Sequence, residues 1–206
     1  MKSKSWLFIL IPILVIIIYV SLPSNEKTKA SSIAIDSSKW VQWKNDKNET
    51  LKTGEESPIE DKKNFTGLTY YPYNPFLALE MQMLKSEKSK LIKIKMNDGT
   101  EEDLILFGQL KGKFENSEIS LTVFQHENGD LFIPFKDKTA PTETYGGGRY
   151  LDIPISSLHD SGILIDFNFA YNPFCAYNPN YACPVPPKEN QLQVRIDAGE
   201  KFIPHE

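Results

Sequence analysis

The sequence predicts a mainly β domain, an antiparallel β-sandwich or partly closed barrel, with a short N-terminal helix and one transmembrane helix before it. Three observations support this prediction. From about residue 65 onward, short apolar runs alternate with turn signals, and almost no helical periodicity interrupts them. An amphipathic stretch precedes this region, and an uncharged apolar stretch lies nearer the N-terminus.

The apolar stretch covers residues 6–23, from Trp6 to Pro23, and contains no charged residue. Eighteen residues of helix span roughly 27 Å, close to the ~30 Å thickness of a hydrocarbon core. Two lysines precede it, so the positive-inside rule places residues 1–5 in the cytoplasm. We expect a single-pass membrane protein whose domain lies outside the cytoplasm, either in a periplasm or at the cell surface.

A cleaved signal peptide is the competing interpretation of this stretch. The residues directly after it, Ser21–Ser24, make a poor cleavage site, and the small residues near Ala30 lie far from its end. An uncleaved signal anchor is therefore favoured. Residues 24–35 are small and polar and resemble a tether, which leaves 36–206 as one extracytoplasmic domain.

The helix is expected to begin at Asp36-Ser37-Ser38, where a carboxylate or hydroxyl can cap free backbone N–H groups. It carries Trp40, Val41 and Trp43 and should end near Gly54.

The strands are expected where apolar or alternating runs stand between turn signals. They are 76–84, 91–96, 104–110, 119–125, 131–135, 150–155, 162–168 and 192–196. Turns are expected at Asn97-Asp98-Gly99, Lys111-Gly112-Lys113 and Glu127-Asn128-Gly129-Asp130, because glycine and asparagine tolerate the positive φ of tight hairpins.

The composition excludes one class of partner. The formal net charge is −4 and the isoelectric point is about 5.5, so the chain offers no positive field for a phosphate backbone. We therefore predict no binding of nucleic acid.

Residues 137–201 differ from the rest of the chain in carrying long motifs rich in Tyr, Asn, Pro and Gly. They include Glu143-Thr144-Tyr145-Gly146, Gly148-Arg149-Tyr150-Leu151-Asp152, Asp166-Phe167-Asn168, Ala170-Tyr171-Asn172-Pro173 and the segment from Cys175 to Lys201. By these motifs, and by Phe132-Ile133-Pro134-Phe135 before them, the chain resembles the domain of unknown function 1684 family of bacteria and archaea. The resemblance covers about residues 36–203 and implies no established activity, substrate or catalytic residue.

The proline-rich loop in this region should be pre-organised, and ordered long loops on β scaffolds often carry function. A packed cover over one end of the barrel is the structural alternative. The candidate ligand-binding residues are Arg149, Tyr150, Asp152, Asp166, Asn168, Tyr171, Asn172, Glu189 and Asn190. Gly146–Gly148 precede a strand rather than a helix, so they indicate a bend or a close backbone approach and not a phosphate loop.

Cys175 and Cys183 are the only cysteines, and three roles remain open for them. Export favours a disulfide bond between them. Two thiolates binding a metal would need further ligands, such as Asp166, Asn168 or Glu189, because the histidines have no metal-like spacing. A nucleophilic thiol would need a base, and none is identifiable. We predict the disulfide, and neither a metal nor another cofactor.

Two functions are compatible with these residues. The first is a membrane-anchored domain that binds a small molecule or a component of the cell envelope. The second is an extracytoplasmic hydrolase that uses carboxylates, with or without a metal; its candidates are Asp152, Asp166, Glu189 and Glu200. A purely structural role is a third possibility. Convergence of Arg149, Asp166, Asn168 and Glu189 on one pocket would support a site.

Overall fold

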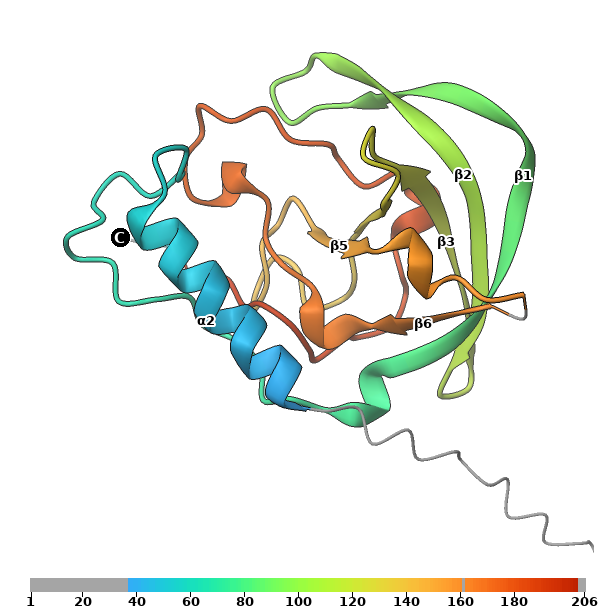
Figure 1. Cartoon of the computed structure of the whole chain (residues 1–206), viewed down its shortest axis with the longest axis horizontal. Coiled ribbons are helices and arrows are strands. Elements are labelled where there is room, and N and C mark those ends of the chain that lie inside the picture. The colour runs from blue at the N-terminus through green and yellow to red at the C-terminus, as the bar shows by residue number, and fades with distance from the viewer. Residues whose placement is uncertain (1–36, 161, 204–206) are drawn as a thin grey trace, which may run out of the picture. The chain divides into compact units, whose positions relative to one another are not determined.

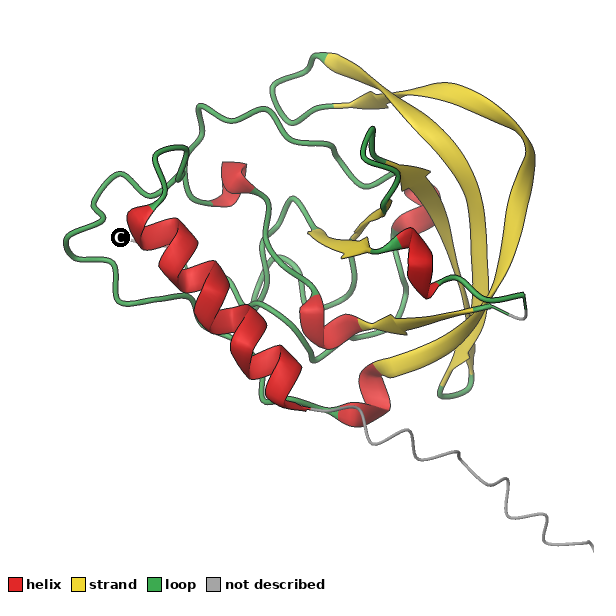
Figure 2. Cartoon of the chain, viewed as in Figure 1, coloured by secondary structure: helices red, strands yellow, loops and turns green. Residues whose placement is uncertain are grey.

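The computed structural model describes residues 37–160 and 162–203. The elements are α2 (Ser37–Thr53), β1 (Ala78–Lys95), β2 (Glu101–Phe114), β3 (Ser117–Gln125), β4 (Leu131–Phe135), β5 (Arg149–Ile153) and β6 (Ile163–Asp166). Five single-turn 3-10 helices accompany them: η2 (Pro75–Leu77), η3 (Ile155–Ser157), η4 (Phe167–Phe169), η5 (Phe174–Ala176) and η6 (Lys188–Asn190). Strands gather on one side of the domain, and long loops connect them to α2 on the other (Figure 2).

One antiparallel sheet of six strands, in the order β5-β4-β3-β2-β1-β6, forms the framework (Figure 1). It curls until its two ends nearly meet. Tyr171, which follows β6 and η4, exchanges two backbone hydrogen bonds of 2.8 and 3.0 Å with Tyr150 of β5. The mainly β prediction is confirmed, and of its two alternatives the partly closed barrel is the one observed.

The strongest curvature lies in the β1–β2 ribbon. The register shifts between Lys85 and Lys90 on β1 and between Leu106 and Gly108 on β2. At this bulge the Leu84 carbonyl oxygen lies 2.4 Å from the position that a Cβ on Gly108 would occupy. Bulges bend strands and increase their twist, and here glycine allows the two backbones to approach.

The turn predictions are confirmed at the two places where glycine is needed for a backbone conformation with positive φ. Asn97–Gly99 joins β1 to β2, and Glu127–Asp130 joins β3 to β4, with positive φ at Gly99 and Gly129. The turn predicted at residues 111–113 was wrong, because Gly112 lies inside β2. There its Cβ position is 2.9 Å from Met81 Cγ, so packing explains this glycine.

Two strand predictions also differ from the structure. The runs 76–84 and 91–96 belong to the single strand β1, which continues through its bulge. Residues 192–196 form no strand; this segment instead follows residues 136–138, through the bonds Leu192 N to Lys136 O (2.7 Å) and Lys138 N to Val194 O (3.0 Å).

The helix prediction is confirmed by α2, which ends directly before Gly54. Its docking to the barrel depends on Trp40, which is 8% exposed and donates its indole N–H to the carbonyl of Asn168 at 2.9 Å. Leu51 is buried near the other end of α2.

The core contains two clusters of buried side chains. The larger fills the barrel between β1, β3, β4, β5 and β6 and includes Leu121, Ile133, Leu151, Ile165 and Phe167. The smaller lies toward the β1–β2 hairpin and brings Phe132 and Tyr150 against Cys175 and Cys183. The proline-rich loop therefore covers part of the core, as its structural interpretation expects.

The transmembrane prediction falls on residues 6–23, which lie outside the described residues. Within residues 37–160 and 162–203, no helix has the length and apolar character needed to cross a bilayer.

Candidate functional site

Arg149 is a structural residue at the centre of a buried polar network. Its side chain is 1% exposed and donates to Asp137 Oδ1 at 3.0 Å, to the Ile196 carbonyl at 3.0 Å and to the Ala198 carbonyl. Asp137 in turn accepts the Ile196 N–H at 2.8 Å. Arg149 thus ties β5 to the segment 196–200, while its Nε has no hydrogen-bond partner among the described residues.

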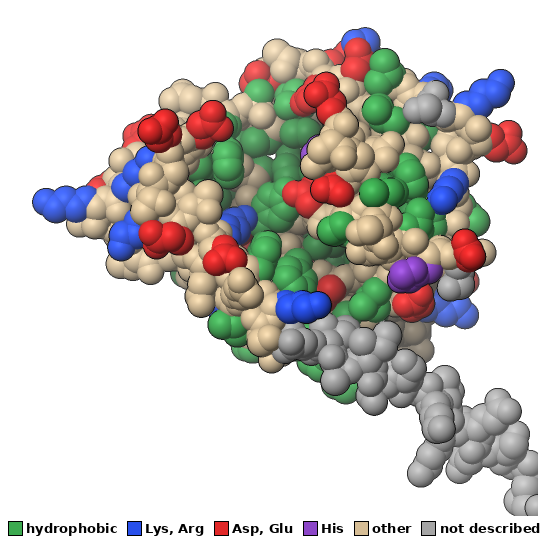
Figure 3. Space-filling view, in the orientation of Figure 1, with side chains coloured by type: hydrophobic (Ala, Val, Ile, Leu, Met, Phe, Trp, Pro, Cys, Tyr) green, Lys and Arg blue, Asp and Glu red, His purple; other side chains and the backbone are tan. Residues whose placement is uncertain are grey.

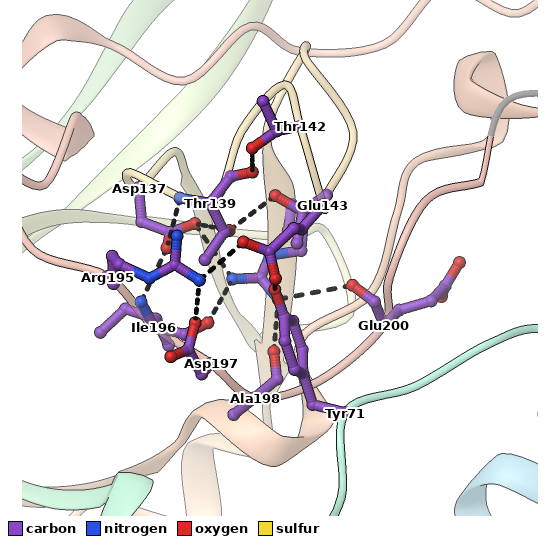
Figure 4. A network of polar contacts seen from close by, with 12 residues as sticks. Tyr71, Asp137, Thr139, Thr142, Glu143, Arg195, Ile196, Asp197, Ala198 and Glu200 are labelled. Carbon is purple, nitrogen blue, oxygen red and sulfur yellow. Dashed lines mark hydrogen bonds and ion pairs between the residues drawn. The ribbon is translucent and has the colours of Figure 1, made fainter.

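The same network continues outward to Glu143, which accepts a hydrogen bond from Tyr71 at 3.0 Å and pairs with Arg195 at 2.7 Å (Figure 4). Arg195 also pairs with Asp197 at 2.8 Å. Side chains of this outer part are roughly half exposed, so the pairs are screened by water and contribute little to stability.

Three more sequence candidates hold loops in place. Asn190 accepts the Thr122 N–H at 2.6 Å and donates to the carbonyls of Thr122 and Pro134. Asn168 bonds both backbone groups of Asn74. The Tyr150 hydroxyl donates to the carbonyl of Pro184 at 2.5 Å. Asn168 and Tyr150 thereby bond backbone groups of loops, and Asn190 fixes its own loop to the backbone of β3 and β4.

Asp166 and Glu189 lie apart from each other and from Arg149. Asp166 accepts the backbone and amide N–H groups of Asn168, and burial raises the pKa of its carboxyl. Glu189 borders a groove of about 580 Å³ over β1–β3, beside Leu84 and Pro187. Asp166 and Asn168 are hydrogen-bonded to each other, but the convergence of Arg149, Asp166, Asn168 and Glu189 on one pocket, which would have supported a site there, is not observed.

A different place in the domain has the character of a site. The face seen in Figure 3 is hollowed between the side formed by α2 and the side formed by β5. Hydrophobic side chains line this hollow, and acidic, basic and histidine side chains stand at its edge.

Asp152 of β5 carries a carboxylate that is 44% exposed and held on both oxygens. Its Oδ1 lies 2.9 Å from His126 Nε2, and its Oδ2 accepts the hydroxyl of Tyr171. The hydrogen bond to Asp152 raises the pKa of His126, and burial raises that of Tyr171, which keeps the phenol protonated as a donor. The carboxylate is thus oriented while part of it remains open to solvent.

Lys47 of α2 connects this group to a second acid. Its ammonium lies 3.1 Å from Oε2 of the fully buried Glu200 and 4.1 Å from the centre of the Tyr171 ring. Burial lowers the pKa of Lys47, although the negative charges of Glu200 and Asp152 act to raise it. Burial also raises the pKa of Glu200. The Lys47 side chain is still 16% exposed, so part of it remains accessible to solvent.

Beside Glu200 stand two buried polar atoms that lack a partner among the described residues. They are Oδ1 of Asn172 and the hydroxyl of Tyr70. The amide of Asn172 donates to Glu200 Oε1 at 2.8 Å and to the Lys201 carbonyl at 3.0 Å. Orphaned buried polar atoms are costly, so these two positions are suited to a water molecule or a polar ligand atom.

Cys175 and Cys183 are free thiols in the structure, and each is hydrogen-bonded to the other. The N–H of Cys175 also lies 3.3 Å from Cys183 Sγ. The disulfide is not formed in the structure and stays a prediction. Within the described residues, no three His, Cys, Asp or Glu side chains gather as a metal site would require.

The structure brings together Asp152 and Tyr171 from the sequence candidates, with Glu200 beyond them. It adds Lys47 and His126, which the sequence analysis did not select because both lie outside the motif-rich segment. A signal for Lys47 existed, since it follows Trp43 by four positions and so shares its helix face.

Fold and site together define a class: a partly closed six-stranded antiparallel barrel with one helix packed on it and an apolar hollow, edged by charged side chains, between helix and barrel (Figure 3). The chain belongs to the family described as "Protein of unknown function (DUF1684)", whose model matches residues 63–201. The motifs that carry the resemblance, from Phe132 to Lys201, fall within this match, whereas residues 36–62, including Lys47, do not.

A solved structure of similar fold comes from Haloarcula marismortui, the solution NMR structure of an uncharacterized protein. It is 29% identical, with a TM-score of 0.65, and the alignment covers 80% of this chain and 93% of that chain. A comparison with curated proteins finds no match.

Proposed function

We propose that this domain binds a small molecule, free or as part of a cell-envelope component, in the hollow between α2 and β5. The observation that carries the proposal is the half-exposed Asp152 carboxylate, oriented by His126 and Tyr171. A carboxylate fixed in this way is a ready acceptor for a hydroxyl, amide or ammonium group of a ligand.

The surroundings supply the remaining parts of a binding site. Hydrophobic side chains line the hollow (Figure 3), and Lys47, whose ammonium lies over the Tyr171 ring, adds a cation that can donate to a ligand oxygen. Binding sites commonly combine such apolar walls with a few oriented polar groups.

The proposal includes the location of the domain. Residues 6–23 hold the chain in a membrane, and the domain faces the outside of the cytoplasm, where it meets small solutes or envelope material. The charge pattern around residues 6–23 supports this orientation.

A hydrolase has weaker support. Asp166 and Glu189 do not join Asp152, and Glu200 is fully buried and occupied by Lys47 and Asn172. Paired carboxylates for acid–base chemistry would need a shared, accessible space between them.

The test uses the full chain purified from its host. Denaturing extraction and mass spectrometry identify a retained small molecule, and calorimetric titration measures its affinity; sugars, amino acids and nucleosides serve as probes if nothing is retained. Asp152→Asn should weaken binding roughly ten- to hundredfold, because a charge-assisted hydrogen bond is lost.

Asp103→Asn is the matched control, since Asp103 forms an exposed pair with Lys93 on the β1–β2 ribbon. It should leave the affinity unchanged. Equal affinity of the wild type and Asp152→Asn, or no binding by any probe and no retained molecule, would contradict the proposal.

A further inference from the structure

We propose that Cys175 and Cys183 form a reversible dithiol–disulfide centre that reacts with small-molecule disulfides. Cys183 is the attacking thiolate and Cys175 the resolving thiol. This inference does not depend on the hollow binding a ligand, and it goes beyond a static structural disulfide because it assigns different roles to the two sulfur atoms.

The asymmetry comes from hydrogen bonds that converge on one sulfur. Cys183 Sγ accepts the backbone N–H of Cys175 at 3.3 Å. Hydrogen bonding from the Cys175 side chain and from this N–H lowers the pKa of Cys183 to about 7. The hydrogen bond to Cys183, together with burial, raises the pKa of Cys175. Because the thiolate is the nucleophile, Cys183 should react first.

The position of the pair selects the kind of reactant. The two cysteines are only 9% and 7% exposed, and they pack with Phe132 and Tyr150 in the smaller core cluster. Because both sulfurs are largely shielded, a small disulfide is a better reactant than a bulky protein disulfide. Phe174, next to Cys175, is 41% exposed.

The loop that carries both thiols is held at its second end. The N–H of Cys183 donates to Asn97 Oδ1 at 2.6 Å, and the N–H of Asn97 donates to the Cys183 carbonyl at 3.0 Å. The β1–β2 hairpin therefore fixes Cys183 in place, and Cys183 Sγ lies 3.3 Å from the backbone nitrogen of Cys175.

The reaction proceeds by two exchanges. Cys183 thiolate attacks one sulfur of glutathione disulfide; that S–S bond breaks, one glutathione thiolate leaves, and a mixed disulfide forms on Cys183. Cys175 then loses its proton to solvent, and its sulfur attacks Cys183 Sγ and releases the second glutathione. Two protein thiols are oxidised, and one disulfide is reduced to two thiols.

The experiment follows the reduced full chain in glutathione disulfide by acid quench and mass spectrometry. The wild type should pass through a mixed disulfide to an intramolecular bond. Cys175→Ser should accumulate the mixed disulfide on Cys183. Cys183→Ser should react at least about tenfold more slowly, because Cys175 lacks thiolate character.

A measurement on the wild type alone tests the same order of reactivity and is unaffected if a variant misfolds. Substoichiometric alkylation of the reduced wild type, followed by peptide mapping, should label Cys183 before Cys175, with a rate that rises with pH through about 7. Equal labelling of both cysteines, or failure of the wild type to form the bond in excess glutathione disulfide, would overturn the proposal.

Discussion

At the scale of single residues, the family motifs serve two different purposes. Arg149, Asn168 and Asn190 are buried and bond backbone groups of loops and strands, whereas the carboxylate of Asp152 is 44% exposed. The sequence alone does not separate these purposes, because polar residues in loops have the same appearance in both roles. Burial separates them.

The buried ion pair gives the first prediction. Asp137→Asn should lower the free energy of unfolding by about 3–5 kcal/mol, because it leaves the guanidinium of Arg149 buried without a compensating charge. Urea denaturation measures the change. Arg195→Gln, at the exposed end of the same network, should leave the midpoint unchanged, and equal effects of the two variants would contradict this account.

The second prediction concerns pH. Asp152 raises the pKa of His126 above 6.5, and Asp130 and Glu102 act in the same direction. The folded state therefore favours protonated His126, so its stabilisation is complete below pH ~6.5 and is lost as pH rises through the folded-state pKa.

Denaturation of the wild type and His126→Gln between about pH 5 and pH 9 tests this. The stability advantage of the wild type should be largest at the acidic end and shrink toward the alkaline end. An advantage that is constant or grows with pH would rule out the hydrogen-bonded pair.

At the scale of elements, the successes and failures of sequence-based prediction have a common cause. The turn at Asn97–Gly99 was predictable because its glycine has φ +88°, a demand of the local backbone. The turn predicted at Gly112 was wrong because glycine is needed there for a tertiary reason: the Met81 side chain packs against it. Residues 192–196 have a strand-like composition but form no strand. Their backbone groups form hydrogen bonds with residues 136–138 and with the Arg149 side chain, and not with a complete neighbouring strand.

The same limit applies to the candidate site. Asp152 and Tyr171 were selected because they lie in long motifs, but their meeting depends on the closure of the barrel at Tyr150. Lys47 and His126 reach them from α2 and from the end of β3. No local pattern specifies such contacts between distant segments.

The bulge in the β1–β2 ribbon gives the third prediction. Gly108→Ala should destabilise the domain by about 2–3 kcal/mol, because the new Cβ meets a backbone carbonyl that cannot move aside. Gly112→Ala is the matched variant, since its Cβ meets the side chain of Met81, 2.9 Å from Cγ, and not a backbone carbonyl.

Thermal and urea denaturation compare the two glycine variants with the wild type. The Gly112→Ala protein should stay within about 1 kcal/mol of the wild type, since a side chain in a strand interior offsets part of the crowding. A Gly108→Ala protein as stable as Gly112→Ala would show that the ribbon relaxes freely at its bulge.

At the scale of the whole molecule, the proposed anchor gives the fourth prediction. The full chain should remain with the membrane fraction after alkaline carbonate extraction, and a chain that starts at Ser31 should not. Mass spectrometry of the mature protein should find the residues before Trp6. A mature N-terminus near residue 24 or 31 would instead indicate cleavage.

The network around Arg149 also has a consequence for synthesis. Its carbonyl partners extend to Glu200, 51 positions further along the chain. At about 5–20 residues per second, the ribosome adds them roughly 3–10 s after Arg149. During this interval the guanidinium lacks its native set of partners, and burying it would be costly. The nascent chain therefore cannot complete the barrel strand by strand. Its final closure waits for the segment 196–200.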